Sequence, residues 1–496
     1  MKNNQTSYQH IMKATSIFGG VQVFNILIAI IRSKFIAVLL GPTGMGISGL
    51  LNSSIGLISS ITNFGLHTSA VKNIAEANGS GDTIRIATIV GVFRKLIWIT
   101  GLLGAILMLI LASRLSDYTF GNRDYTFAFI WLAISLLLNQ ISSGQKVLLQ
   151  GMRRIKLMAK ASLIASTLGL FITIPIYYYW GLDGIVPNII LTSCLTLLVF
   201  YFFSRKVKID KIAISLRTTM YEGKGMLVMG FFIGLTAIMD QIVEYATRIF
   251  ISNQGGVDEV GLFNAGFVIV NTYVGMIFAA MMTDYYPRLS AVAHDNKASG
   301  VVINQQAEIA VLILAPMVIL FLVFIKVIVI ALYSEKFISI DKMIYWAMLG
   351  VLFKALNWSI GIIVLAKGAT KLYLFTYIIA VIIVLSTNIG GYYYFGLEGL
   401  GIAFLVTNFL LTLSGIVICG HLYAFVLSPE LIKVFGIQFL LSLSCFIVML
   451  ISNSPLNYFI GIILFLTSFF YSFKELDKRI GIKPIIISIK NRFKRQ

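Results

Sequence analysis

The sequence predicts an all-α integral membrane protein with about 14 transmembrane helices, arranged as two six-helix lobes followed by two further C-terminal helices. Three observations predict this class. The 496 residues are 58% hydrophobic and only 12% charged, about half the charged fraction of an average soluble domain. Apolar segments of about 20 residues, the length that crosses a bilayer, recur along the whole chain. Short motifs of the first half also recur in the second half at one fixed offset.

Fourteen apolar segments are long enough to span a membrane, and segments longer than about 20 residues are expected to tilt or to project beyond the lipid. Because fourteen is even, both termini are predicted on the same side. The predicted spans lie near residues 12–39, 45–70, 87–112, 125–148, 158–179, 184–204, 224–251, 259–284, 306–332, 342–365, 371–394, 398–420, 433–451 and 456–473.

The basic residues fix the predicted orientation, because cytoplasmic loops of membrane proteins are rich in Lys and Arg. The chain has a net charge of +19, and most of its basic residues fall in alternate loops, in the linker 206–223 and in the tail 474–496. The opposite set of loops holds only Arg114, Arg123, Lys336 and Lys342. Both termini are therefore predicted to be cytoplasmic. This distribution argues against nucleic acid as the reason for the positive charge.

An internal repeat divides the chain. The segment Trp180–Ile185 matches Phe395–Leu400 at an offset of 215 residues. The same offset relates further pairs, among them Phe35 and Phe250, Gly41 and Gly256, and Gly46 and Gly261. Two lobes of equal topology, related by a pseudo-two-fold axis along the membrane normal, are expected from such a repeat.

The repeat and the charge pattern together predict the domain organisation. It comprises an N-terminal lobe (1–205), a cytoplasmic linker (206–223), a C-terminal lobe (224–421), two extra transmembrane helices (422–473) and a basic cytoplasmic tail (474–496).

No enzyme signature is present, and the chain is predicted not to be an enzyme. The four histidines are scattered, the three cysteines form no CxxC pair, and no phosphate-binding G-x-x-x-x-G-K-[ST] loop occurs. No loop exceeds about 20 residues, which leaves little room for a catalytic domain outside the membrane. We expect neither a metal nor an organic cofactor.

Three charged residues lie on one stripe of the seventh predicted span. Asp240, Glu244 and Arg248 are spaced four apart, so a helix places them on one face. A charge near the bilayer centre costs roughly 2.5–3.5 kcal/mol on insertion scales. The stripe must therefore face partners, water or substrate.

Two arginines are the first candidates for substrate binding. The repeat places Arg32 one residue from the counterpart of Arg248, so each half carries a guanidinium at a similar depth. The bidentate fork of arginine suits phosphate. The alternative is that each arginine is neutralised within its own helical bundle, Arg248 by Glu244.

Further polar residues within the spans are candidates for the same cavity. Lys354 lies near the middle of its span and is interpreted as a cavity-lining cation. Amide side chains can bind sugar hydroxyls, although each is individually more typical of hydrogen bonds between helices. The amides assigned to the predicted cavity are Gln22, Asn25, Asn139, Asn271 and Asn357.

Several segments carry a family resemblance. The stretches Phe35–Gly46, Asn63–Leu66, Leu148–Arg154 and Tyr286–Ser290 resemble the polysaccharide-transporter family. The match is best to the O-antigen (Wzx-type) flippases of the multidrug/oligosaccharidyl-lipid/polysaccharide exporter superfamily. The resemblance covers about residues 1–420.

The resemblance implies a function. Members of this family move undecaprenyl-pyrophosphate-linked oligosaccharide from the cytoplasmic to the periplasmic leaflet of the bacterial inner membrane by alternating access. The implied partners are that lipid-linked substrate and membrane lipids, with functional association to a polysaccharide polymerase and to glycosyltransferases.

A coupling ion, H⁺ or Na⁺, is also implied by the resemblance. Related lipid II flippases hold a cation between spans 7, 11 and 12. Asp240 is similar to the acid of span 7, and Asn388 and Thr407 are the candidates on the other helices. Glu244, one turn after Asp240, is added because acids within a span commonly mark a coupling-ion site. The alternative for Asp240 is a hydrogen bond between helices or a protonated side chain. The acid of span 11 is absent, which weakens the expectation of a sodium site.

Two other functions stay open at this stage. A cation-coupled multidrug exporter has the same fold, but its substrates are usually cationic and would favour an acidic cavity. A membrane polymerase or ligase of glycan assembly usually has a large outer loop, whereas the predicted outer loops here are short.

Overall fold

The computed structural model describes residues 2–210, 212, 214–451 and 455–480, and their regular secondary structure is entirely helical. Within this part of the chain, eleven helices are long and apolar enough to cross a membrane. Three of the eleven are divided by a glycine with a left-handed backbone, at Gly41, Gly181 and Gly396. Each division separates two of the predicted spans. The structure confirms the predicted all-α membrane fold.

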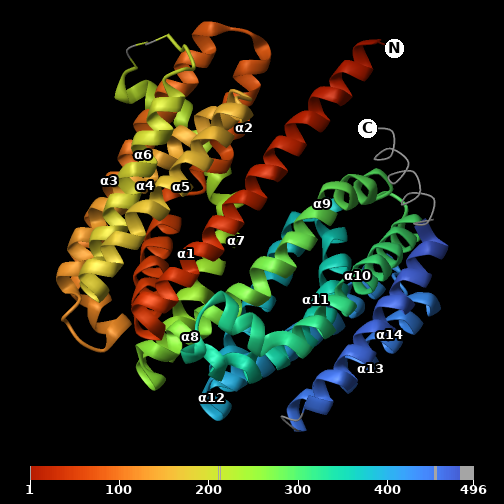
Figure 1. The fold of residues 1–496 in the computed structure, drawn as a ribbon. Helices are drawn as coiled ribbons and strands as arrows, with labels where there is room; N and C mark the ends of the chain where they lie inside the picture. The colour runs from red at the N-terminus through yellow and green to blue at the C-terminus, as the bar shows by residue number, and fades with distance from the viewer. Residues whose placement is uncertain (1, 211, 213, 452–454, 481–496) are drawn as a thin grey trace, which may run out of the picture. The chain divides into compact units, whose positions relative to one another are not determined.

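The helices follow one another with short connections (Figure 1). They are α1 (Lys2–Asn63), α2 (Leu66–Ser80), α3 (Thr83–Phe120), α4 (Thr126–Gly151), α5 (Ile155–Trp180), η1 (Gly181–Gly184), α6 (Ile185–Ser204), α7 (Leu216–Gly255), α8 (Val257–Val268), η2 (Ile269–Tyr273), α9 (Val274–Ala291), α10 (Asn296–Leu332), η3 (Glu335–Ile340), α11 (Asp341–Ala366), α12 (Thr370–Tyr423), α13 (Pro429–Ile451) and α14 (Pro455–Ile480).

The backbone repeats at the offset seen in the sequence. Gly41 and Gly256 both have positive φ, 67° and 89°, and separate consecutive helical segments. Gly181 and Gly396 do the same, with φ of 53° and 58° and ψ of −130° and −141°. Residues with a Cβ atom rarely adopt this region. The matched glycines therefore mark equivalent chain reversals in the two halves of the sequence.

The helices pack as two compact units. Unit 1 comprises Met1–Gly261 with Leu332–Lys336, and unit 2 comprises Leu262–Ala331 with Phe337–Gln496. Helix α7 packs against α1, α2 and α3, where its Tyr245 hydroxyl lies 2.8 Å from Thr119 Oγ1. The units are defined by packing, and the predicted lobes are defined by the repeat. Packing places α7 in unit 1, whereas the repeat assigns most of it to the C-terminal lobe (224–421). The division into lobes remains a prediction.

Within unit 1, two glycines of the repeat make a reciprocal contact. A Cβ atom on Gly46 would lie 1.9 Å from the carbonyl oxygen of Val257, and one on Gly261 would lie 1.9 Å from that of Pro42. Pro42 and Val257 are themselves related by the offset of 215. The start of the second half of α1 thus crosses the start of α8 with local two-fold character, backbone against backbone.

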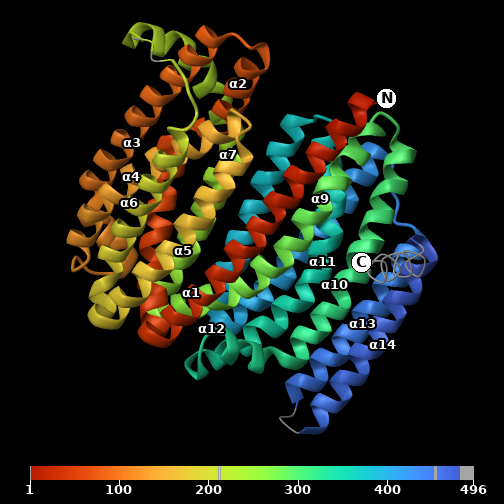
Figure 2. The ribbon, with the colours of Figure 1, turned by 45° about the horizontal axis from the view of Figure 1, so that its top comes forward.

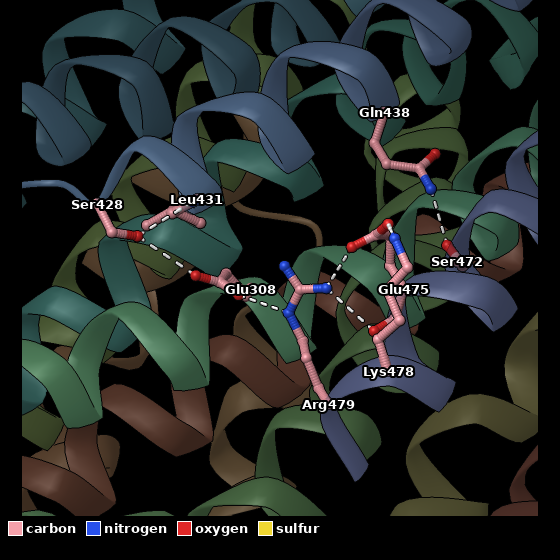
Figure 3. Close-up of polar contacts among 8 residues, drawn as sticks. All are labelled: Glu308, Ser428, Leu431, Gln438, Ser472, Glu475, Lys478 and Arg479. Carbon is pink, nitrogen blue, oxygen red and sulfur yellow. Dashed lines mark hydrogen bonds and ion pairs between the residues drawn. The ribbon is translucent and has the colours of Figure 1, made fainter. Parts of the chain in front are cut away.

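In unit 2, the last two helices lie side by side next to α10 (Figures 1 and 2). Figure 3 shows the polar contacts that hold these helices against α10. Arg479 of α14 donates from Nε to Glu308 Oε2 of α10 at 2.7 Å and from Nη1 to Glu475 Oε2 at 2.5 Å. The Glu308 side chain, only 9% exposed, also accepts from Ser428 Oγ at 3.3 Å. A buried charge network therefore ties α14 and the loop before α13 to α10.

Substituting either glycine of the crossing should destabilise the protein. Gly46→Ala or Gly261→Ala forces two backbones apart, and overpacking of this kind costs typically 1–3 kcal/mol. We expect a lower melting temperature in detergent for both variants. Gly225→Ala in α7, where a Cβ meets nothing within 4 Å, is the matched control. Equal melting temperatures for all three variants would contradict the close crossing.

Removing the central arginine of the α10–α14 network should also lower stability. Arg479→Gln leaves the Glu308 carboxylate buried without its cation, and we expect a loss of ~3 kcal/mol, the low end for broken buried pairs. Lys478→Gln removes an ion pair whose lysine is 59% exposed and should cost under about 1 kcal/mol. Chemical unfolding of the two variants side by side is the measurement. A loss for Lys478→Gln as large as that for Arg479→Gln would refute the assignment.

Candidate functional site

Unit 1 contains a polar cavity of about 560 Å³ among α1, α4, α5 and α6. Two cations, Arg32 and Lys146, reach into it, and the described residues that line it include no carboxylate. Most of the other lining residues carry hydroxyl or amide groups. They are Ser48, Asn52, Asn139, Ser142, Ser143, Ser162, Ser166, Tyr177, Asn188, Thr192, Ser193 and Thr196. The cavity therefore offers positive charge and hydrogen bonds inside an otherwise apolar helical bundle.

Helical periodicity brings these side chains together on α4. Asn139, Ser142, Ser143 and Lys146 follow the i, i+3, i+4, i+7 pattern that lines one face of a helix. The result is one polar stripe on an apolar helix, directed into the bundle.

The facing stripe on α5 has the same spacing and small side chains, Ser162, Ala165, Ser166 and Gly169. A Cβ atom on Gly169 would lie 3.0 Å from Arg32 Nη2. Small residues on α5 thus leave the space that the guanidinium and the cavity occupy.

The hydrogen-bonding groups of the cavity are only partly satisfied. Asn188 donates from Nδ2 to the Tyr177 hydroxyl at 2.8 Å, but its buried Oδ1 has no hydrogen-bond partner within the described part of the chain. The same holds for the buried Nε of Arg32, which also has no carboxylate within 4.0 Å there. Buried polar groups are normally paired, so each unpaired one calls for an explanation. A bound ligand that presents both an anion and hydroxyl groups would satisfy these atoms.

Two of the predicted amides belong to this region. Asn139 lines the cavity and donates to Ser135 Oγ at 3.4 Å. Asn25 of α1 donates from Nδ2 to Ser162 Oγ of α5 at 2.9 Å, so it positions a lining residue. The side chain of Gln22 lies outside the described residues.

The charged stripe of α7 has a different environment. Arg248 forms an ion pair with Glu244, one helical turn away, and Gln241 Nε2 donates to Glu244 Oε2 at 3.3 Å. This pairing is the alternative that the sequence left open for Arg248. Asp240 lies at the exposed end of the same stripe.

The remaining predicted residues lie in unit 2. Lys354 of α11 donates to Asn271 Oδ1 at 3.3 Å, and Asn357 follows on the same helical face. Thr407 is buried in the second half of α12, with its Oγ1 2.6 Å from Thr387 Oγ1 in the first half, beside Asn388. The four residues assigned to a coupling ion are thus divided between units 1 and 2, and that set remains a prediction.

Sequence reasoning missed Lys146 and the serine-rich stripes. Lys146 lies at the end of the predicted span 125–148, where a lysine is typical of the membrane interface. The signal that would have found it is the repeated i, i+3, i+4, i+7 pattern of hydroxyl and amide residues in the fourth and fifth spans. Taken one at a time, these residues are typical of hydrogen bonds between helices.

A comparison with protein-family models identifies the family of this chain. Residues 35–342 match the family described as "Polysaccharide biosynthesis protein". The chain belongs to this family.

Curated relatives of this family member carry transport names. A Shigella flexneri protein whose name assigns it to O-antigen transport is 25% identical over 358 residues, which cover 70% of this chain and 82% of that protein. The lipid III flippase of Escherichia coli (strain K12) is 21% identical over 346 residues, which cover 69% and 82% of the two chains.

Solved structures share the fold. The lipid II flippase MurJ in an inward closed conformation matches with a TM-score of 0.71 and 13% identity, covering 93% of this chain and 99% of that one. An inward-facing MATE family multidrug transporter of the MOP superfamily matches with a TM-score of 0.65 and 16% identity, covering 87% and 96%.

The cavity should bind an inorganic diphosphate. We expect pyrophosphate to raise the melting temperature of the purified protein, because a ligand that binds only the folded state stabilises it. Arg32→Gln and Lys146→Gln should each weaken binding about 10- to 100-fold, since hydrogen bonds to charged groups contribute about 1.5–3 kcal/mol. Lys160→Gln makes the same change of charge on exposed α5 surface outside the lining. If it weakens binding as much as the other two, the cavity is not the binding site.

Proposed function

We propose that the protein is a flippase that moves an undecaprenyl-pyrophosphate-linked oligosaccharide, an O-antigen or similar surface-polysaccharide unit, from the cytoplasmic to the periplasmic leaflet. The observation that carries the proposal is the unit 1 cavity, which combines two cations with many hydroxyl and amide groups and whose described lining includes no carboxylate. Membership of a polysaccharide biosynthesis family and relatives named for O-antigen transport and lipid III flipping support it.

The division of labour within the cavity follows from its chemistry. Arg32 and Lys146 bind the diphosphate, the guanidinium through paired N–H donors and the ammonium as a compact point charge. The serine, threonine and asparagine side chains exchange hydrogen bonds with glycan hydroxyls that would otherwise lose their water. The polyprenyl tail stays in the lipid, so no free energy is lost by moving this apolar chain into a polar cavity.

The predicted topology completes the proposal. The protein is a multi-pass component of the bacterial inner membrane with both termini cytoplasmic, and it acts without chemical catalysis. A polymerase and glycosyltransferases would consume and supply its substrate. H⁺ or Na⁺ entry at Asp240 and Glu244, with Asn388 and Thr407, would reset the carrier.

A multidrug exporter of the same fold is the second candidate, favoured by the likeness to the MATE transporter. Cationic drugs would meet Arg32 and Lys146 without a carboxylate among the described lining residues to compensate, so electrostatic repulsion weighs against this alternative. A glycan polymerase or ligase finds no support in the names of the relatives.

Reconstitution tests the proposal directly. Purified protein in liposomes should move a fluorescent polyprenyl-diphosphate oligosaccharide across the bilayer, and Arg32→Gln or Lys146→Gln should reduce the rate at least tenfold because the diphosphate loses a binding cation. Lys160→Gln should flip at the wild-type rate. Wild-type rates in the Arg32 and Lys146 variants would rule out the assigned role. Resistance of a sensitive host to cationic drugs, without flipping, would favour the exporter.

A further inference from the structure

Lys354 is a cation at the centre of a membrane-spanning helix. Helix α11 runs over Asp341–Ala366, so Lys354 lies about 13 residues, or roughly 20 Å, from either end at 1.5 Å per residue. At that depth the side chain is too short to bring its amine to the lipid headgroups. The amine must therefore be accommodated within the protein.

The contacts of the Lys354 amine would stabilise a positive charge only in part. Nζ donates to Asn271 Oδ1 at 3.3 Å and lies 5.4 Å from the centre of the Phe404 ring. Asn271 belongs to the π-helical turn η2, an element that often occurs at functional sites. An amide oxygen and an aromatic face stabilise a cation only partly. Within the described residues no carboxylate lies within 4.0 Å of this amine.

In the part of the chain that the structure describes, no charged group on the neighbouring helices forms an ion pair with Lys354. The helices packed against α11 are α9, α12 and α13, with the turn η2, and α10 contacts it through the Lys326–Asp341 ion pair. The charged and histidine side chains of these helices are Asp284, Arg288, Lys297, Glu308, Lys326, Lys371, Glu398, His421, Glu430 and Lys433. Glu398 accepts from Trp346 Nε1 at 2.9 Å, and Asp284 pairs with Arg288 at 3.7 Å. None of the carboxylates provides a counter-ion for Lys354.

The amine lies on the accessible stripe of α11. Lys354 and Asn357 are half-buried and Gly361 is exposed, at the i, i+3, i+7 spacing of one helical face. A Cβ atom on Gly361 would meet nothing within 4 Å. A lysine at this depth is costly against lipid, so a polar ligand on this open face would be stabilised by the amine.

We propose that Lys354 is a proton-linked anion site, whose ε-amine takes a proton as a phosphate group binds beside it and loses that proton when the phosphate leaves. Without an anion the neutral amine avoids an uncompensated charge in an apolar layer. With the anion, the amine receives H⁺ from water or hydronium, and the ammonium pairs with the phosphate. The N–H bond forms at the expense of an O–H bond, and no other bond changes.

Proton-linked binding would keep the site close to neutral in both states. The anion and the proton arrive together, so neither state leaves an unpaired charge at mid-membrane depth. The role is charge compensation for a phosphate group bound in unit 2, and it is separate from the diphosphate cavity of unit 1 and from the predicted coupling-ion set on α7 and α12. The inference rests on the proposed function for the identity of the anion.

Calorimetry of pyrophosphate binding in buffers of different ionisation enthalpy measures the protons taken up. Wild type should take up close to one proton more per pyrophosphate than Lys354→Arg at moderately alkaline pH, because arginine stays protonated throughout. Protons that belong to pyrophosphate itself are common to both and cancel. Wild-type affinity should also fall more steeply with rising pH, by up to about tenfold more per pH unit than that of Lys354→Arg.

The control is the same Lys→Arg substitution at a lysine that already forms an ion pair with a carboxylate. Lys326 lies 3.8 Å from Asp341, and Lys326→Arg should leave the proton uptake at the wild-type value. Equal uptake and equal pH profiles for wild type and Lys354→Arg would overturn the inference. If the protein flips the lipid-linked oligosaccharide while wild type and Lys354→Arg show equal proton uptake and equal pH profiles, only the inference about Lys354 is overturned. Normal proton uptake without any flipping would overturn the proposed function and leave Lys354 as an anion site.

Discussion

The cost of a charge within a hydrocarbon layer is the constraint on which this structure depends. Each charged side chain at depth must be paired, hydrated or kept for a ligand. Arg479 is held by Glu308 and Glu475, and Arg248 by Glu244. Arg32 and Lys354 have no carboxylate within ion-pair distance among the described residues. The Arg479–Glu308 pair therefore fixes α14 to α10, the Arg248–Glu244 pair neutralises charge within α7, and Arg32 and Lys354 are places where an anion is expected.

Backbone geometry supplies the second constraint. Glycines at matched positions of the repeat reverse the chain with positive φ, and Gly46 and Gly261 let two helices cross with their carbonyls against each other's Cα atoms. Only a residue without a Cβ fits such positions. This is why the repeat is visible in the sequence at these glycines, while most of the apolar residues around them can be exchanged for others of similar size and preserve it less.

The fold was predictable because hydrophobic length and charge asymmetry are properties of single segments. The site was predictable only in part. Arg32 and Asn139 stood out as polar residues deep in apolar spans, whereas Lys146 appeared interfacial because the depth of a span end is not fixed by composition. The partner of a charge is a matter of packing, so the sequence alone left open whether Arg248 binds substrate or Glu244. Its pairing with Glu244 favours a structural contribution.

The two kinds of cation suit different tasks. A guanidinium stays charged at any pH the protein meets, so Arg32 must be surrounded permanently by dipoles, and the hydroxyl and amide side chains of unit 1 supply them. An amine can give up its proton, so Lys354 can rest against one amide and one aromatic ring. The density of polar groups around Arg32 and around Lys354 thus fits whether the charge of that side chain can be removed. A carrier that must be stable both loaded and empty gains from having both kinds of cation, because the guanidinium of Arg32 keeps its affinity for the anion and the amine of Lys354 lets the charge of the empty state fall.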